Sequence, residues 1–154
     1  MSLPIAIQQR TEQVLASAAS DGRLDFAIKQ AFKLTSAPRG LIKSWKNRRF
    51  SSGDWKIPDI EVVGNGLPLG VAGAYVSDLN LITLSEGFVA STSADEVVAV
   101  LLEEIGHYLE HELDRKEDSP GDEGERFADC LLDRSYQPSV FADDHIQVLL
   151  HDKS

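Results

Sequence analysis

The stretch LLEEIGHYLEH, residues 101–111, has the strongest helical pattern in the chain. Apolar residues recur on one arc of the helix predicted for residues 91–114, and charged residues fill the other arc at about 100° per residue. Glu103, His107 and His111 follow one another at intervals of four residues and form one stripe. Two side chains four residues apart on a helix can bind one metal ion. The stripe is therefore a candidate metal site, and the alternative is a solvated polar face.

Local signals favour a helix with a close neighbour. Ser93 and Glu96 form an S-x-x-E capping box at its start. Gly106 lies inside the helix, where glycine costs about 1 kcal/mol relative to alanine. Close approach of another backbone would explain this glycine. Leu101 and Ile105 occupy the middle of the apolar arc, so we expect both to be buried.

The length of 154 residues predicts a single domain, and the elements expected along it make its fold class α+β. It comprises an N-terminal helical segment, 1–56, and a core, 57–154, within a single domain of 1–154. Helices are predicted over 4–18, 23–34, 125–134 and 138–152, a strand over 57–64, two short extended pieces within 73–88, and a loop over 36–57.

Charge and composition exclude several classes of function. The 154 residues carry a net charge of −10, which argues against nucleic-acid and anionic-membrane binding and is compatible with cation binding. The basic run RGLIKSWKNRR, 39–49, is interpreted as a solvated connector. Cys130 is the single cysteine, so an intrachain disulfide is excluded. The start MSLPIAIQQRTEQ has no signal-peptide pattern, and we expect a cytoplasmic protein.

Residues 70–133 resemble the short zincin-type metallopeptidases, including those that cleave phage repressors. The family pattern runs from an edge strand, here GAYVSDLNLITLS, through L-x-H-E-x-G-H, here LLEEIGH, to an acidic stretch before F-A-x-x-L-L, here ERFADCLL. The segment is also similar to a domain of large cyanobacterial and other bacterial surface or secreted proteins, in which LLEEIGH and DSPGDEG recur together. The resemblance implies a zincin-like core with a small β-sheet, preceded here by a helical extension.

The resemblance also implies a metal site. His107 matches the second histidine ligand, and Glu103 stands at the position of the first. Glu123 matches the third ligand by its spacing to the F-A-x-x-L-L segment, with Glu125 as its substitute. Zn²⁺ is the expected metal. A site with two carboxylates and one imidazole is harder than a histidine-rich site, which favours Mn²⁺ or Ca²⁺ more than usual.

The catalytic role implied by the resemblance falls to Glu104, as the general base that activates water. Asp129 would orient the ligand Glu125, because the two form E-x-x-x-D. A second register, H-x-x-E-H, would instead use His107 and His111 as ligands and Glu110 as the base. The aspartates of the following loop, Asp114, Asp118 and Asp122, leave a loose calcium site as a further alternative.

Two functions from different classes follow. The first is a metal-dependent peptidase acting on a peptide or protein substrate, which adds to an edge strand around residues 81–85. The second is a catalytically silent zincin-fold module that binds a peptide or partner. Neither involves nucleic acid or a membrane.

Overall fold

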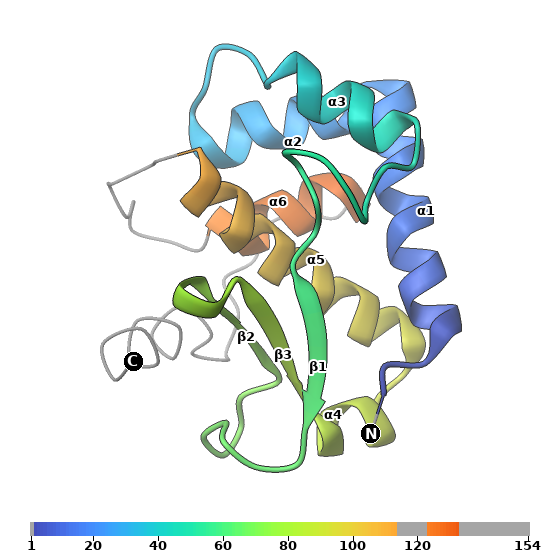
Figure 1. The fold of residues 1–154 in the computed structure, drawn as a ribbon, viewed down its shortest axis with the longest axis vertical. Helices are drawn as coiled ribbons and strands as arrows, with labels where there is room; N and C mark the ends of the chain where they lie inside the picture. Colours follow the sequence, from blue (N-terminus) through green and yellow to red (C-terminus); the bar gives the residue numbers. More distant parts are fainter. Residues whose placement is uncertain (1, 114–122, 133–154) are drawn as a thin grey trace.

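The computed structural model describes residues 2–113 and 123–132 and shows an α+β fold (Figure 1). These residues form six α-helices and a mixed sheet of three strands. The elements in chain order are α1 (Ile5–Asp21), α2 (Arg23–Phe32), α3 (Arg39–Lys46), β1 (Asp59–Val63), β2 (Gly73–Val76), the 3₁₀ turn η1 (Ser77–Leu79), β3 (Leu81–Ser85), α4 (Glu86–Ser91), α5 (Ala94–Glu112) and α6 (Glu123–Leu132).

The sheet has the order β1-β3-β2. β2 turns back through η1 and pairs antiparallel with β3, with Tyr75 opposite Ile82. β1 pairs parallel with the other side of β3, with Ile60 opposite Ile82. The prediction that residues 81–85 form an edge strand is therefore wrong. β3 is hydrogen-bonded on both sides, so a peptide cannot add to it. The two edges of the sheet are β1 and β2.

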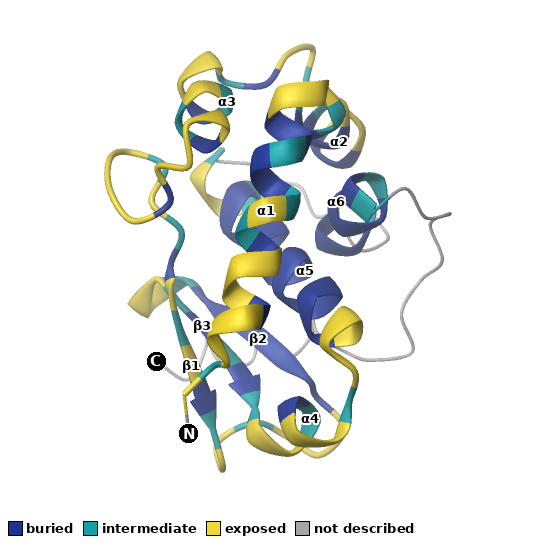
Figure 2. Cartoon of the chain, turned by 90° about the vertical axis from the view of Figure 1, so that its right-hand side faces the viewer, coloured by how far each residue is buried: buried dark blue, intermediate teal, exposed yellow. Residues whose placement is uncertain are grey.

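Helix α5 is the central element, lying between the sheet and the helices α2 and α6 (Figures 1 and 2). Its apolar arc is buried, and Leu101 and Ile105 are fully inaccessible to solvent, as predicted. The rings of Tyr75 on β2 and Tyr108 on α5 meet edge to face, with centroids 6.0 Å apart. On another side, α6 packs along α5, and Phe127 stacks on Phe32 of α2 at 5.9 Å. One hydrophobic core thus joins the N-terminal helices to the sheet.

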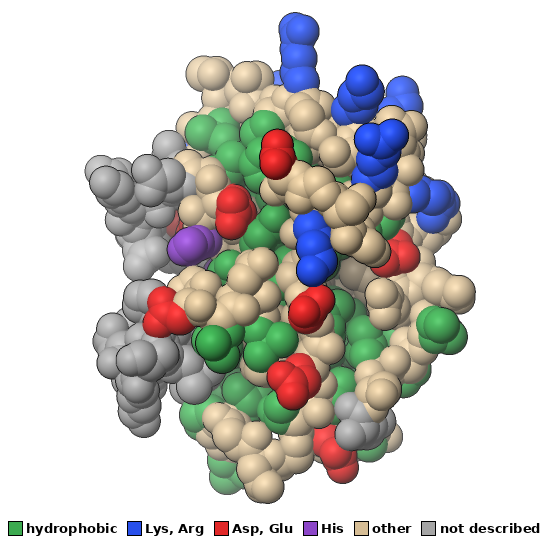
Figure 3. Space-filling model, viewed as in Figure 1, with side chains coloured by type: hydrophobic (Ala, Val, Ile, Leu, Met, Phe, Trp, Pro, Cys, Tyr) green, Lys and Arg blue, Asp and Glu red, His purple; other side chains and the backbone are tan. Residues whose placement is uncertain are grey.

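The segment expected to be a loop, 36–57, contains the helix α3, so that prediction is wrong in part. Leu41 and Trp45 lie one helical turn apart, and both are fully buried. The Trp45 indole N–H donates a hydrogen bond to the carbonyl of Trp55 at 2.9 Å. Glycine, proline and basic residues obscured this short apolar stripe. The basic side chains project from the end of the molecule formed by α2 and α3 (Figure 3).

Helix boundaries differ locally from the prediction. Residues 86–88, which end the stretch expected to contain the extended pieces, instead belong to α4, where the Ser85 hydroxyl accepts a hydrogen bond from the Phe88 N–H. α5 begins after Ser93, whose hydroxyl accepts a hydrogen bond from the Glu96 N–H, so the predicted cap is confirmed. α6 begins two residues before the predicted position of 125. The predicted helix 138–152 lies outside the described residues.

Of the helices that the structure describes, none has the length and apolarity to cross a bilayer.

Candidate functional site

α5 and α6 meet backbone to backbone at Gly106 and Gly124. A Cβ atom added to Gly106 would lie 2.8 Å from the Gly124 Cα and 3.1 Å from a ring carbon of Phe127. A Cβ atom added to Gly124 would lie 2.6 Å from the Glu103 carbonyl oxygen. Real side chains essentially never approach this closely, so the contact requires glycine on both helices. The expected reason for Gly106, close approach of a second backbone, is confirmed.

The same contact brings the His107 imidazole to the first turn of α6. A Cβ on Gly124 would lie 2.8 Å from the His107 Nε2, so the ring lies directly against this glycine. The residues on either side of Gly124 in the chain are Glu123 and Glu125. The helix crossing therefore brings the predicted ligands of α5 and the first turn of α6 into one region.

A second side of α5 faces the sheet. Tyr108 and His111 both place their rings against Tyr75 of β2, with centroids 6.0 and 6.2 Å away. Glu104 precedes Tyr108 by one helical turn, so it belongs to this same side of the helix. The Glu103 carbonyl oxygen and the His107 ring thus lie beside Gly124 of α6, whereas Tyr108, one turn after Glu104, lies against β2.

The predicted site residues are buried, so the solvated-face interpretation is wrong for them. The exposed fractions are small throughout the group: Glu103 8%, Glu104 0%, His107 4%, Glu123 6%, Glu125 6% and Asp129 5%. Moving a carboxylate out of water costs several kcal/mol unless hydrogen bonds or cations compensate. α5 contains no lysine or arginine, and Arg126 is the single one in α6. The local composition is therefore strongly acidic.

The residue types of this donor set are those that bind divalent cations, but their positions in the described residues do not form a metal site. Carboxylates and one imidazole are ligands of Zn²⁺, Mn²⁺ and Ca²⁺. Among residues 2–113 and 123–132, however, no group of three or more His, Cys, Asp or Glu side chains is placed to hold a metal ion. The helices that carry the predicted ligands, α5 and α6, are thus in contact, but in the described part of the chain three donors are not gathered around one point.

The residues of the H-x-x-E-H register lie in different surroundings. His107 is buried, Glu110 is half-buried and His111 is exposed. His107 lies against Gly124 of α6, whereas His111 lies against Tyr75 of β2. The aspartates of the alternative calcium loop, Asp114, Asp118 and Asp122, lie outside the described residues.

Sequence analysis missed two tyrosines beside the candidate site. Burial raises the pKa of Tyr75 to about 12, with a smaller contribution from the charge of Glu112. Burial also raises the pKa of Tyr108, and the charge of Glu112 makes a smaller contribution in the same direction. The Tyr75 hydroxyl pairs with the Asn80 Oδ1 at 3.0 Å. Both phenols therefore remain neutral hydrogen-bond donors at physiological pH. In the sequence, the spacing of Tyr108 one helical turn after Glu104 could have indicated that this tyrosine lies beside the candidate base.

The lone cysteine is not poised for nucleophilic chemistry. Burial raises the pKa of the Cys130 thiol, and the neighbouring carboxylate of Asp129 raises it further. Because the thiolate is the nucleophile, a raised pKa lowers the reactivity of Cys130 near neutral pH. The side chain is half-buried and packs against the hydrophobic core.

Comparison with known proteins adds no relative. No protein-family model matches the chain, and no curated protein or solved structure matches it.

Proposed function

We propose that the chain is a metal-dependent peptidase with a zincin-like core, whose site lies where α5 meets α6. The observation that carries the proposal is the contact of the His107 imidazole with Gly124. It supports the inference that a ligand from α5 and a carboxylate from the first turn of α6 serve one ion. The six buried ionisable residues of the region supply an acidic donor set.

The proposed ligands are Glu103 and His107 from α5 and Glu123 from α6, with Glu125 as the substitute for Glu123. Asp129, one turn after Glu125, would orient that carboxylate. A bound Zn²⁺, or Mn²⁺ or Ca²⁺ in this hard site, would supply Lewis acidity.

Glu104 is the proposed general base. Glu104 is fully buried and lies one turn before Tyr108, on the side of α5 that faces Tyr75. A carboxylate in that position can accept the proton of an attacking water and return it to the leaving amine. The two neutral phenols are donors on the same side, and β2 is the sheet edge nearest to this group.

A second candidate is the catalytically silent zincin-fold binding module. The specific observation in its favour is that the His107 Nε2 lies against Gly124 and is shielded from solvent. A nitrogen covered by backbone must be uncovered before it binds a metal. In this alternative the acidic donor set is inherited but not used for chemistry.

Metal content and two matched substitutions test the peptidase proposal. Protein purified without chelator or histidine tag is soaked with Zn²⁺ or Mn²⁺, and bound metal is measured by elemental analysis. Cleavage of a peptide library is then compared for wild type, Glu104→Gln and Glu110→Gln. We expect one ion per chain, with turnover lost only in Glu104→Gln and metal retained in both variants.

Other outcomes point elsewhere. Loss of turnover in Glu110→Gln alone would favour the H-x-x-E-H register. Substoichiometric metal together with no metal-dependent cleavage by the wild type would contradict the peptidase proposal and favour the binding module.

A further inference from the structure

A groove of about 500 Å³ lies between β1 and α1, and no residue of α6 lines it. Its floor is apolar and includes the buried side chains of Phe50, Val62 and Ile105. Ile57 and Ile60 line it as well and are half-buried. The groove therefore offers apolar surface next to a sheet edge.

The backbone of β1 is available along this groove. β1 pairs with β3 through residues 59–63, and no backbone hydrogen bond joins β1 to any other segment that the structure describes. In an edge strand, alternate N–H and C=O groups point away from the sheet and can pair with an added strand. The two edges differ, since all four residues of β2 are buried whereas Asp59 and Glu61 of β1 are exposed.

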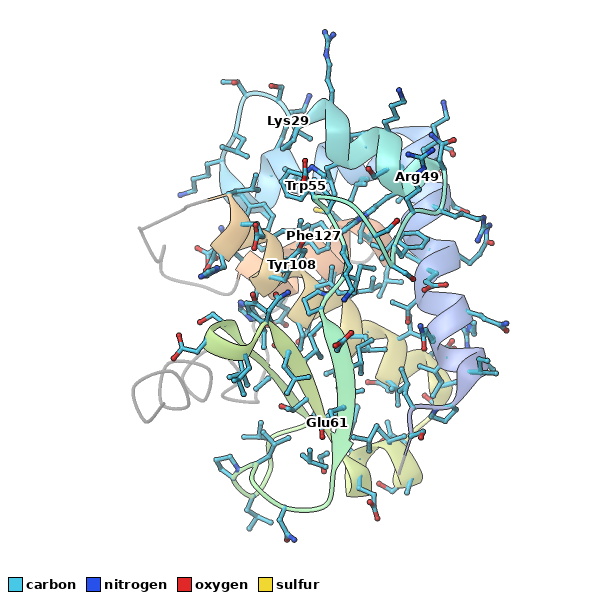
Figure 4. All side chains as sticks on the ribbon, viewed as in Figure 1. Lys29, Arg49, Trp55, Glu61, Tyr108 and Phe127 are labelled. Carbon is cyan, nitrogen blue, oxygen red and sulfur yellow. The ribbon has the colours of Figure 1, made fainter. Side chains whose placement is uncertain are left out.

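The rim of the groove is acidic. Glu12, Asp59 and Glu61 line it, and Lys56 is the single cation among the lining residues. The Lys56 Nζ lies 3.6 Å from a carboxylate oxygen of Asp59, so these two charges offset each other. Glu12 and Glu61 remain as an excess of negative charge on the two walls. Glu61 lies on the β1 wall (Figure 4).

We propose that this groove binds an extended basic peptide, which adds to the sheet beside β1. Backbone hydrogen bonds to β1 would supply affinity, and alternate side chains would contact the apolar floor. Lysine or arginine at the intervening positions would complement the acidic rim. The occupant is a segment of a partner protein with alternating apolar and basic residues. The proposal is independent of the metal site, because no proposed ligand or base lines the groove.

Charged residues on an edge strand can have another role, which is to discourage pairing between copies of a protein. That role alone predicts no affinity for a basic strand. The two interpretations therefore give opposite results in a binding measurement.

The probe is a fluorescein-labelled nonapeptide of alternating lysine and valine, KVKVKVKVK. Its binding to the full chain is measured by fluorescence anisotropy in EDTA, so that cleavage does not interfere. The matched controls are EVEVEVEVE and a KVKVKVKVK peptide that is N-methylated at alternate residues. The N-methylated peptide keeps the charge but loses backbone donors. We expect each control to bind roughly tenfold or more weakly than the probe.

Matched charge reversals locate the binding site. Glu61→Lys should weaken binding of the probe by roughly tenfold. Glu112→Lys makes the same charge change at the end of α5 and should alter binding by less than roughly twofold. Amide hydrogen exchange should show new protection at residues 59–63 when the probe is bound.

Four results would overturn the proposal. They are no binding of the basic probe, equal binding of the N-methylated peptide, equal effects of the two charge reversals, and protection at 73–76 instead of 59–63. Equal effects of the reversals would mean that the net charge of the chain, not the groove, attracts the probe.

Discussion

Gly106 of α5 and Gly124 of α6 touch so closely that a Cβ on the first would lie 2.8 Å from the Cα of the second. The pair sets the distance between the two helices that carry the buried acidic residues. Small residues at a helix crossing let the backbones approach, and here they bring the His107 ring against α6. The glycines are thus part of what positions the candidate site.

Gly106→Ala should destabilise the protein, although alanine is the better helix former by about 1 kcal/mol. The added methyl group meets the backbone of Gly124, which cannot rotate away, and overpacking of this kind costs roughly 1–3 kcal/mol. Urea denaturation should therefore show a net loss of free energy of unfolding. Gly87→Ala in α4 is the control, because its nearest neighbour is the Ser85 Oγ at 3.8 Å. An unchanged or higher stability of Gly106→Ala would contradict the close contact.

Leu101→Ala tests α5 as the centre of the core. Leu101 is fully buried, and truncation of such a side chain costs about 2–5 kcal/mol. Leu79→Ala serves as the comparison, since Leu79 in η1 is 68% exposed and its truncation should cost less than about 0.5 kcal/mol. Chemical denaturation of both variants measures the difference. Similar small losses would place Leu101 outside the core.

Glu103→His separates the two proposed functions. The substitution creates H-E-x-x-H and replaces a carboxylate donor by an imidazole, which should strengthen Zn²⁺ binding. If the wild type is a silent module, cleavage should appear only in the variant. If Glu103 is the proper ligand of a working peptidase, cleavage by the wild type should fall. Calorimetric zinc titration and a peptide-cleavage assay measure the two effects. Tight zinc binding without cleavage by either form would count against any peptidase.

The stability of the protein should fall in alkaline solution because of its buried tyrosines. Burial raises the pKa of Tyr75 from 10.0 to about 12, so the folded state holds the phenolic proton more tightly than the unfolded chain does. The free energy of unfolding that this tighter proton binding contributes is fully present below about pH 10 and is lost as pH rises toward 12. Urea denaturation between pH 8 and pH 11, which brackets roughly the onset of this loss, should show the decline.

Tyr75→Phe and Tyr108→Phe provide the controls for that decline. Each variant should lose part of the pH dependence, because phenylalanine has no proton to release. Absorbance titration should show a late phenolate signal that shrinks in both variants. Ionisation of all the tyrosines near pH 10 would contradict the burial of this pair.

Much of the fold could be predicted because the decisive patterns are local. The α5 periodicity, the Ser93 cap and the burial of Leu101 and Ile105 each depend on residues within a few turns of one another. α3 was missed because Leu41 and Trp45 make too short a stripe to stand out from their basic surroundings. The place of β3 at the centre of the sheet depends on pairing with β1, which lies about twenty residues away and leaves no local signal.

The residues of the candidate site stand out in the sequence, but their burial does not. The spacing of Glu103 and His107 is visible in the sequence, and so is the odd presence of Gly106. Whether such a stripe faces water or protein depends on what packs on it, and a polar pattern normally indicates a solvated face. The partner is α6, whose Gly124 contacts both Gly106 and His107. The burial of the stripe is therefore a tertiary property.

The hydrogen bond between Trp45 and Trp55 places both tryptophans of the chain in the stretch that precedes β1. Tyr75 and Tyr108 instead couple β2 to α5. Tryptophan fluorescence therefore reports on α3 and the stretch before β1, whereas the part of the tyrosine signal that is lost in Tyr75→Phe or Tyr108→Phe reports on the contact between β2 and α5. A single denaturant titration followed by both chromophores reveals whether the two regions melt as one cooperative unit, in which case the midpoints coincide, or in separate steps.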